Sequence, residues 1–354
     1  MAAAVIPRIM RKVLVTGATG QDGYFLCDML CSRNEVHVMV RRNSSNSLGT
    51  LEFLPMYVLD NIIIHWGDIT DAGFVDSLIR MDFDQVYHLA AMSYVGYSFL
   101  NPSNTFDVNL KGTVNVLEAI RRLSPETRMY FAGSSEMYGK PEKAPQNEDT
   151  PFAPRSPYAV SKVAAFHMVR NYRDGYGLHV CSGIAFNHES EVRGPEFVTQ
   201  KIARYMADMR DNGYRQPLKL GNLNAKKDWG FAGDFVEAMT MMLDHGATKD
   251  YVIGTGEMHT VREFATLACR MATGQEIRWE GAGLNEKGYV GSNCVVEVDR
   301  SLFRPLEADN YMADASRIAH EIGWRPKMSF SALVRRMVEK ARLTISATAA
   351  RRAS

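Results

Sequence analysis

Long apolar runs are missing from this sequence, and cysteine is scarce. No uninterrupted apolar stretch in the 354 residues approaches the roughly 18 residues that a membrane-spanning helix needs, so we expect no membrane association. The apolar part of the N-terminal MAAAVIPRIMRK is too short for a secretory signal. The five cysteines have no paired spacing, which favours a reducing compartment, and we expect the protein to be cytoplasmic.

An excess of charge of either sign is also missing. The sequence has 41 Lys and Arg against 40 Asp and Glu, for a formal net charge of +1. This balance argues against binding to nucleic acid or to an anionic membrane surface through bulk charge, so any polyanionic ligand must be met by locally placed Arg and Lys. No CxxC, HExxH or other clustered ligand pattern occurs, so we expect no metal site.

Strands and helices are predicted to alternate along the first half of the chain. Five such alternations indicate an α/β fold with a doubly wound parallel Rossmann sheet, in which ligands bind at the carboxyl ends of the strands. Short β-branched or apolar runs predict strands at 12–16, 35–40, 61–65, 85–89, 129–132 and 179–185, with helical patterns up to 31, over 104–122, and from 157 to about 173, where Gly175 is expected to end the helix.

A glycine-rich loop lies between the first predicted strand and the first predicted helix. Glycines at this position let the backbone turn tightly and let a pyrophosphate approach the free N–H groups of the helix N-terminus. The alternative is a glycine-rich turn without a ligand. The candidate cofactor-binding residues of this loop are Gly17, Ala18, Thr19, Gly20, Gln21, Asp22 and Gly23.

The second predicted strand ends in Arg41 and Arg42, followed by Asn43 and two serines. Sites that prefer NAD usually have an Asp or Glu at this point, which binds the ribose 2′-hydroxyl, whereas an arginine accommodates a 2′-phosphate. The two arginines therefore predict NADP as the cofactor. The alternative is a solvated basic turn.

Two further strand ends supply candidate cofactor contacts. Asp68 and Ile69 follow the third strand, and the small residues Ala90 and Ala91 follow the fourth, where a cofactor could lie against the backbone. Asp71 fits the N-cap of a helix equally well.

The stretch from 130 to 162 contains several side chains that can transfer protons. Ser134 and Glu136 lie two residues apart where an apolar run ends, so an extended backbone would place both on one side of the strand. Tyr158 and Lys162 are four apart after Pro157, on one helical face, where the ammonium would lower the pKa of the phenol from about 10. Such a set can move a hydride and a proton at adjacent carbons. The alternative is a surface Tyr–Lys pair.

The second half of the chain is predicted to contain a smaller substrate domain interleaved with the sheet. The expected Rossmann domain is 11–186 plus about 232–255, and the sugar-nucleotide domain is 187–231 and 256–340. Helices are predicted at 197–211, 234–245 and, as the last helix, 315–322. A strand is predicted at 250–254, a basic loop at 219–228, a mobile segment at 281–291, and flexible tails at 1–10 and 344–354.

With these motifs assembled, the chain resembles the extended short-chain dehydrogenase/reductase family and, within it, the GDP-mannose 4,6-dehydratase family over about residues 11–340. The segments behind this resemblance are TGATGQDG, VRRNSS, GDITD, SSEMYG, PFAPRSPYAVSK, FNHESEVRG, LGNLNAKKDWG and FRPLEAD. The resemblance implies an NADP-dependent lyase that forms GDP-4-keto-6-deoxymannose and water from GDP-mannose, as a homodimer or homotetramer.

The resemblance also implies residue roles. Tyr158 would remove the proton of the C4 hydroxyl, Lys162 would hold the nicotinamide ribose, Ser134 would bind the sugar's O4 in place of the usual threonine, and Glu136 would take the C5 proton. Matching cofactor contacts are the glycine loop, Asp68, Ile69, Leu89, Ala90, Ala91, Ser93, Lys162, His188 and Arg193. Matching substrate contacts are Asn187, Lys201, Lys227, Arg304 and Glu307.

Several alternatives remain at this stage. Val192 stands where the family usually has an arginine, and Lys227 replaces an arginine expected at phosphate, so another GDP-sugar such as a GDP-heptose is an alternative substrate. A related reductase or epimerase would not need Glu136, and an idle nucleotide-sensing protein would need none of the four catalytic candidates. His188 could instead be a structural histidine, and Arg304 could simply pair with Glu307.

Overall fold

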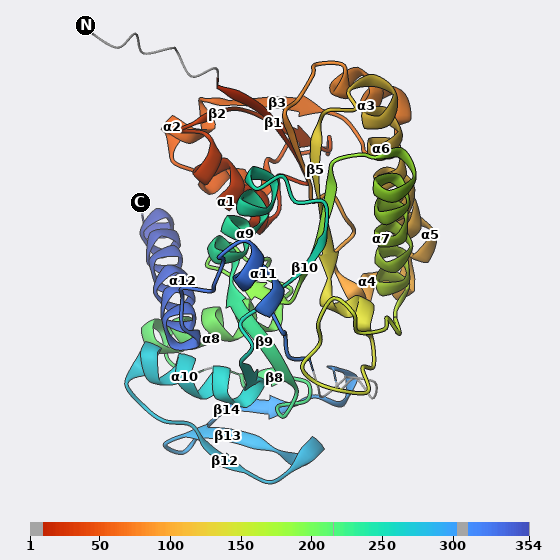
Figure 1. The fold of residues 1–354 in the computed structure, drawn as a ribbon. Coiled ribbons are helices and arrows are strands. Elements are labelled where there is room, and N and C mark those ends of the chain that lie inside the picture. The colour runs from red at the N-terminus through yellow and green to blue at the C-terminus, as the bar shows by residue number, and fades with distance from the viewer. Residues whose placement is uncertain (1–9, 215, 303–310, 354) are drawn as a thin grey trace, which may run out of the picture. The chain divides into compact units, whose positions relative to one another are not determined.

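Seven strands rich in apolar and β-branched residues form the largest sheet of the protein, for which we have a computed structural model (Figure 1). The structure describes residues 10–214, 216–302 and 311–353, without the side chains of 346–353. The strand order is β10-β6-β5-β4-β1-β2-β3, and β1 pairs in parallel with β2 and β4, β2 with β3, and β4 with β5. The strands are β1 Arg11–Thr16, β2 Asn34–Val40, β3 Ile62–Trp66, β4 Gln85–His88, β5 Arg128–Ser134, β6 Val180–Ala185 and β10 Asp250–Ile253.

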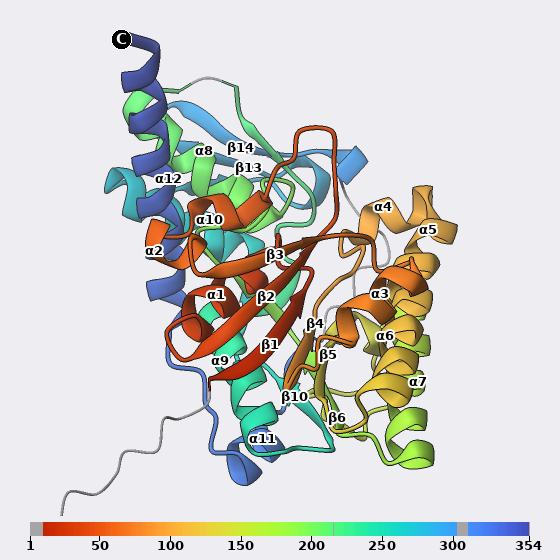
Figure 2. The ribbon, with the colours of Figure 1, turned by 90° about the horizontal axis from the view of Figure 1, so that it is seen from above.

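Helices cover both faces of this sheet, as the two ribbon views agree. Helices α3, α6 and α7 lie on one face, and α1 and α9 on the other (Figures 1 and 2). The doubly wound parallel sheet predicted from the sequence is therefore confirmed. The helices of this part are α1 Gln21–Leu30, α2 Met56–Leu59, α3 Ala72–Ile79, α4 Val95–Leu100, α5 Pro102–Phe106, α6 Gly112–Leu123, α7 Pro157–Tyr176 and α9 Ala232–Asp244, with a π-helical segment at Asp107–Lys111 between α5 and α6.

The chain divides into two compact units. The first comprises residues 1–137, 154–184 and 236–251, and the second comprises 138–153, 185–235 and 252–354. The segment 138–153, which the sequence-based division assigned to the Rossmann domain, thus lies in the second unit. The six strands predicted in the first half of the chain are present, with ends that differ by at most two residues.

Helix α7 extends beyond its predicted end. Gly175 was expected to end it, but the helix runs to Tyr176 and is capped by Gly177, which has a left-handed φ of 70°. The backbone N–H of Gly177 donates to the carbonyl groups of Tyr172 and Arg173. A glycine does end α7, as predicted, but the glycine with the positive φ is Gly177 and not Gly175.

The second unit packs helices against two small sheets. Its sheets have the orders β11-β9-β7 and β12-β13-β14-β8. Its core contains Trp229, Phe264 and Met337, all buried. The elements are β7 Asn187–Glu189, α8 Val198–Asn212, β8 Leu218–Leu220, β9 Lys226–Phe231, β11 Met258–Thr260, α10 Val261–Thr273, β12 Arg278–Glu280, β13 Lys287–Val290, β14 Asn293–Val298, α11 Ser316–Glu321 and α12 Phe330–Ala353.

Two predictions of secondary structure for this unit were wrong, and regular elements also occur in two segments that were expected to be mobile or flexible. The basic segment 219–228, expected as a loop, contributes to β8 and β9, and the segment 281–291 contains β13, which pairs with β12 and β14. The helix at 316–321 is not the last one, because α12 follows and continues through 344–353, where a flexible tail was expected. Residues 1–9 of the other expected tail lie outside the described residues.

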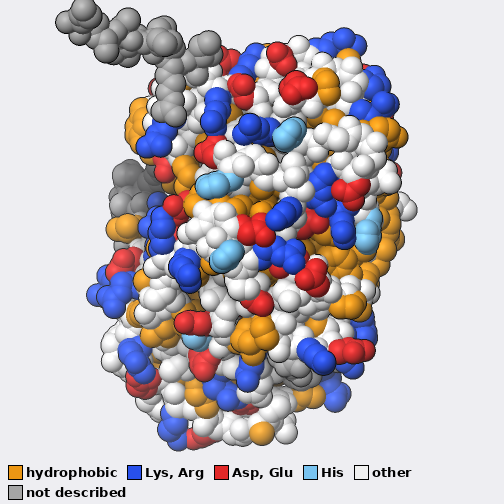
Figure 3. All heavy atoms as spheres, in the orientation of Figure 1, with side chains coloured by type: hydrophobic (Ala, Val, Ile, Leu, Met, Phe, Trp, Pro, Cys, Tyr) orange, Lys and Arg blue, Asp and Glu red, His pale blue; other side chains and the backbone are white. Residues whose placement is uncertain are grey.

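The charged side chains on the surface agree with the balanced composition. Acidic and basic side chains are interspersed over the face drawn in Figure 3. Among the described residues, no helix is long and apolar enough to cross a membrane, and no three His, Cys, Asp or Glu side chains are grouped to hold a metal ion.

The close approach of α1 to the end of β1 leads to a stability prediction. A Cβ atom on Gly23 would lie 2.2 Å from the carbonyl oxygen of Ala18, so Gly23→Ala must push the backbone of α1 away. We expect it to lower the free energy of unfolding by about 1–3 kcal/mol, measured by urea denaturation. The matched control is Gly175→Ala in α7, where a Cβ meets no atom within 4 Å and should stabilise by about 0.5–1 kcal/mol. Equal effects of the two substitutions would contradict the argument.

Candidate active site

The glycine loop forms a cradle at the N-terminus of α1. Gly17 has a φ of 71°, and a Cβ there would lie 2.6 Å from the backbone nitrogen of Ala90, so only glycine fits between the ends of β1 and β4. A Cβ on Gly20, by contrast, would find its nearest neighbour 3.6 Å away. No side chain caps α1 at Gly20. These features fit a pyrophosphate group, because they leave backbone N–H groups and open space in front of a helix N-terminus.

The loop after β2 is fastened to the glycine loop. The Asn43 side-chain oxygen accepts hydrogen bonds from the backbone N–H groups of Ser45 and Ser47, and Thr50 donates its hydroxyl to the carbonyl of Gly20 at 2.7 Å. Arg41 and Arg42 are exposed at the start of this loop. The Arg42 guanidinium lies 6.0 Å from the centre of the Trp66 ring, at the end of β3. The predicted basic residues thus lie on the same edge of the sheet as the glycine cradle.

The polar groups of the turn after β3 have hydrogen-bond partners within the protein. The Asp68 carboxylate accepts from the backbone N–H and the hydroxyl of Thr70. Asp71 accepts from the backbone N–H of Phe74 and caps α3, so the N-cap alternative for Asp71 is confirmed. The carbonyl of Ile69 accepts from the side chain of Asn115 at 2.9 Å, which holds this turn against α6.

Ser134 and Glu136 come together in a way that the sequence analysis did not predict. The case of an extended backbone through both residues was considered from the sequence, but β5 ends at Ser134, and Glu136 lies in the 3-10 helix Ser135–Tyr138. The backbone N–H of Glu136 donates to the Ser134 hydroxyl oxygen at 3.2 Å. The tight turn, and not the period of two, therefore holds the backbone of the half-buried residue Glu136 against the Ser134 hydroxyl.

Tyr158 and Lys162 lie on the buried face of α7. The helix begins with Ser156 as N-cap, which accepts from the N–H of Ala159, and with Pro157 as the first residue. The Lys162 ammonium donates to the carbonyl of Ala132 in β5 at 2.9 Å and lies 5.0 Å from the centre of the Phe131 ring. Burial lowers the pKa of Lys162 from 10.5 to about 8. The hydrogen bond to Ala132 ties the Tyr–Lys pair to the strand that ends in Ser134.

Five further candidates that the structure describes belong to the second unit. His188 donates from Nδ1 to the carbonyl of Phe186 at 2.7 Å and stacks on Phe235, so it has the partners of a structural histidine. Arg193 forms an ion pair with Glu189 at 3.3 Å and lies over the Phe197 ring. Asn187 begins β7, Lys201 is exposed on α8, and Lys227 lies 4.8 Å from the centre of the Tyr311 ring. Arg304 and Glu307 lie outside the described residues.

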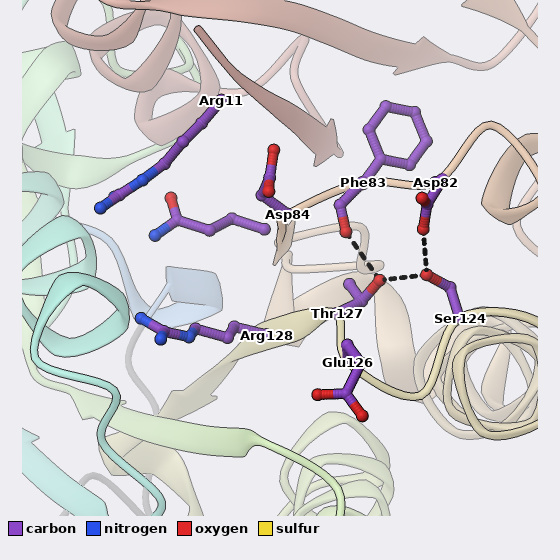
Figure 4. A pocket seen from close by; sticks show the side chains of 9 residues that line it. Arg11, Asp82, Phe83, Asp84, Ser124, Glu126, Thr127 and Arg128 are labelled. Carbon is purple, nitrogen blue, oxygen red and sulfur yellow. Dashed lines mark hydrogen bonds between the residues drawn. The ribbon is translucent and has the colours of Figure 1, made fainter. Parts of the chain in front are cut away.

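One polar cavity of about 340 Å³ lies in the first unit, at the edge where β1, β4 and β5 begin (Figure 4). Its groups are engaged with the protein. Arg11 pairs with Asp244, Arg128 donates to the carbonyl of Leu243, and Asp84 accepts from the N–H of Lys12. Because dinucleotides bind at the opposite, carboxyl edge of such sheets, we assign this cavity no part in the site.

The sequence analysis missed a group of fully buried polar side chains beneath the cradle. A polar residue inside an otherwise apolar strand, His88 in QVYHL, was a signal that could have pointed to this group. Each member is at most 1% exposed and hydrogen-bonded to another member; they are Thr16, His88, Asn109, Thr113 and Ser161.

Comparison with known proteins decides the family. The family model described as GDP-mannose 4,6 dehydratase matches residues 14–337. The chain belongs to the GDP-mannose 4,6-dehydratase family. Curated members include GDP-mannose 4,6 dehydratase 1 of Arabidopsis thaliana, 43% identical over 341 residues that cover 93% of this chain and 90% of the relative. The GDP-mannose 4,6 dehydratase of Drosophila melanogaster is 42% identical over 339 residues, covering 93% of this chain and 85% of the relative.

Solved structures agree with the family assignment. DesIV, a dTDP-glucose 4,6-dehydratase of Streptomyces venezuelae solved with NAD and TYD bound, is 26% identical with a TM-score of 0.76, covering 95% of this chain and 98% of that one. The UDP-glucose 4-epimerase of Thermus thermophilus, solved in complex with NAD, is 28% identical with a TM-score of 0.77, covering 94% and 99%. The fold is thus shared by enzymes that act on nucleotide sugars.

Proposed function

We propose that this protein is an NADP-dependent GDP-mannose 4,6-dehydratase, a hydro-lyase that converts GDP-mannose to GDP-4-keto-6-deoxymannose and water. The observation that supports it best is the turn after β5. That turn holds Glu136, the residue that would supply the carboxylate, to the Ser134 hydroxyl through its backbone N–H, while Lys162 ties the face of α7 that contains Tyr158 to the same strand. A dehydratase needs this carboxylate in addition to the Ser, Tyr and Lys that a simple dehydrogenase uses.

The first step is oxidation at C4 of the hexose. Bound NADP would accept the hydride from C4 and return it later to C6. Tyr158 takes the proton of the C4 hydroxyl as that hydride leaves, and Ser134 donates a hydrogen bond to O4. Lys162, which is charged below a pKa of about 8, favours the deprotonated form of Tyr158.

The elimination follows because a C4 ketone acidifies the C5–H bond. Glu136 removes the C5 proton, and the protonated carboxyl then gives a proton to the departing C6 hydroxyl, which leaves as water. With a hydride supplied to C6 by bound NADP, one proton would still be needed at C5, and Tyr158 holds the proton that it took in the first step. Hydride and protons balance, so the net change is the loss of one water and no external reductant is required.

The direct test is incubation of the purified protein with GDP-, dTDP-, UDP- and CDP-sugars, followed by mass spectrometry. We expect loss of one water from GDP-mannose. Loss of water from a GDP-heptose alone would support the alternative substrate, which was considered because Val192 and Lys227 differ from the residues usual in the family. Conversion without loss of water would favour a reductase or epimerase, and binding without conversion would favour a nucleotide-sensing protein. Any of these three results would overturn the proposal of a GDP-mannose 4,6-dehydratase.

Arg42 provides a test of the cofactor. In our proposal its guanidinium binds the 2′-phosphate of NADP, so Arg42→Ala removes a charge-assisted hydrogen bond that NAD never makes. We expect NADP affinity to fall by about 10–100-fold and NAD affinity to change by less than about threefold, measured by fluorescence titration. Arg33→Ala, at another exposed arginine, should change neither affinity. Equal losses for both dinucleotides would refute the NADP assignment.

The remaining assignments are also part of the proposal. We propose that the first unit binds NADP and the second the GDP-sugar, with Asn187, Lys201, Lys227, Arg304 and Glu307 as sugar-nucleotide contacts. We also propose His188 and Arg193 as contacts of the cofactor. We further propose a cytoplasmic homodimer or homotetramer.

A further inference from the structure

His88 is the centre of a buried chain of hydrogen bonds in the first unit. Its Nδ1 lies 2.9 Å from the hydroxyl of Thr16, at the end of β1, and its Nε2 lies 3.0 Å from the hydroxyl of Thr113, on α6. The side chains of all three residues are 0–1% exposed. No water or surface group can therefore substitute for these partners, and the orientation of each proton depends on the neighbouring groups.

The outer ends of the chain determine which ring nitrogen has the proton. The Thr113 hydroxyl donates to the carbonyl of Asn109 at 2.7 Å, so its oxygen is left to accept from Nε2–H of His88. At the other end, the Thr16 oxygen accepts from the backbone N–H of Ala90 at 3.3 Å, so its own proton is free to go to Nδ1. The assignment is a neutral imidazole protonated at Nε2, in which every donor finds an acceptor.

The other two protonation states leave groups unsatisfied. With the proton on Nδ1, Thr113 must donate to Nε2, so the carbonyl of Asn109 loses the Thr113 hydroxyl as a donor, and the Thr16 proton has no acceptor in this network. A doubly protonated ring would leave the Thr16 proton without an acceptor in this network. Burial, together with the positive charge of Lys162, lowers the pKa of His88 to about 3, in agreement with a ring that stays neutral.

The chain joins the cofactor cradle to the helix that contains Tyr158. Ala90, at one end, is the residue against which Gly17 of the cradle packs. At the other end, Asn109 donates through its side-chain amide to the hydroxyl of Ser161 at 2.9 Å, and Ser161 donates to the carbonyl of Tyr158 at 2.7 Å. Asn109 lies in the π-helical segment Asp107–Lys111, an irregularity that is frequent at functional sites.

We propose that His88 is a positioning residue which, as the neutral Nε2–H tautomer, holds the glycine cradle through Thr16 and the start of α7 through Thr113 and Asn109. The inference rests on the proposed function, since it treats the cradle as the cofactor site and Tyr158 as the base. His88 itself touches neither substrate nor cofactor in this assignment.

Two amide substitutions can separate the two arms of the chain. In His88→Asn the amide oxygen falls near the place of Nδ1 and can accept from Thr16, while Thr113 loses its donor. In His88→Gln the amide nitrogen reaches the place of Nε2 and can donate to Thr113, while Thr16 loses its acceptor. We expect His88→Asn to lower kcat by about tenfold with near-normal NADP affinity, and His88→Gln to weaken NADP binding by about tenfold with near-normal kcat at saturating NADP.

The tautomer can be read directly in the unmodified protein. We would label histidine with ¹⁵N and record two-bond ¹H–¹⁵N spectra of the full chain with NADP bound. His88→Phe, which keeps a ring but has no nitrogen, identifies which of the nine histidines gives the His88 signals. We expect an unprotonated Nδ1 and a protonated Nε2 that stay unchanged from pH 8 to pH 5.5.

Several outcomes would overturn the inference. In the spectra, a His88 ring protonated at Nδ1 or at both nitrogens would contradict it. In the kinetics, the contradicting result is that His88→Asn and His88→Gln change kcat and NADP affinity in the same way. If His88→Phe does not fold, Thr113→Val can identify the signals, because removal of its hydroxyl perturbs Nε2 selectively. The spectra and the NADP affinities do not need turnover. A wild-type protein that binds NADP but dehydrates no GDP-sugar would therefore refute the proposed function and leave this inference testable.

Discussion

Glu136→Gln is expected to reduce the rate of water loss from GDP-mannose by at least about 100-fold, because an amide cannot take the C5 proton. The substitution keeps the size of the side chain. It also keeps the hydrogen bond from the backbone N–H of residue 136 to Ser134, which does not involve the carboxylate. NADP affinity should stay within about twofold of wild type, since the proposed cofactor contacts do not include Glu136.

A partial reaction gives the sharper measurement for Glu136→Gln. Oxidation at C4 depends on Tyr158 in the proposed mechanism, so the variant should still develop the absorbance of reduced nicotinamide after mixing with substrate, without releasing a dehydrated product. Glu126→Gln is the matched control, because Glu126 is an exposed carboxylate at the opposite edge of the sheet. Water loss at the wild-type rate in Glu136→Gln would remove Glu136 from the mechanism.

Lys162→Met is expected to stabilise the fold while it removes most of the activity. Burial holds the pKa of Lys162 near 8, compared with 10.5 in an exposed chain. This difference corresponds to a cost of about 3 kcal/mol for keeping the ammonium charged inside the folded protein. The buried methionine avoids that cost, although it also loses the hydrogen bond to Ala132. Without the charge, less of Tyr158 is in the phenolate form near neutral pH, and we expect kcat to fall by about 100-fold.

The pH dependence of the stability difference between Lys162→Met and the wild type tests whether the buried charge causes it. Below pH 8 the lysine is charged in both the folded and the unfolded chain, so the whole destabilisation is present there. Between pH 8 and 10.5 only the unfolded chain keeps the proton, so wild-type stability gains as the pH rises. Urea denaturation should show an advantage of up to about 3 kcal/mol for Lys162→Met at pH 7, shrinking toward pH 10. Lys140→Met, at an exposed lysine, should show none, and an advantage that grows with pH would contradict this explanation.

The sequence predicted the strands best where apolar and β-branched residues follow one another without interruption. The strands of the large sheet are nearly all of this kind, and β1, β2, β4 and β6 are almost completely buried. Their carboxyl ends could therefore be located to within two residues. Because ligands bind at these ends, the glycine loop and the arginines after β2 followed from the same pattern.

The errors lie where polar residues form regular structure or where a helix has no sharp boundary. Strand β9, KKDWGF, is stabilised by pairing with β7 and β11 and not by an apolar pattern of its own. Helix α12 did leave a signal, since Leu333, Val334, Met337 and Val338 recur at helical spacing and are buried. The chain of His88 partners could not be predicted, because it joins residues from four separate segments through contacts that only the fold creates.

The position of β10 has a consequence for biosynthesis. This strand lies beside β6 at one edge of the large sheet, although about 65 residues of chain separate the two in sequence. While a ribosome is still making that intervening chain, β6 has unpaired backbone groups along one side, and such an edge can pair with a neighbouring nascent chain. Truncated products that stop before β10 should consequently be the aggregation-prone species during synthesis.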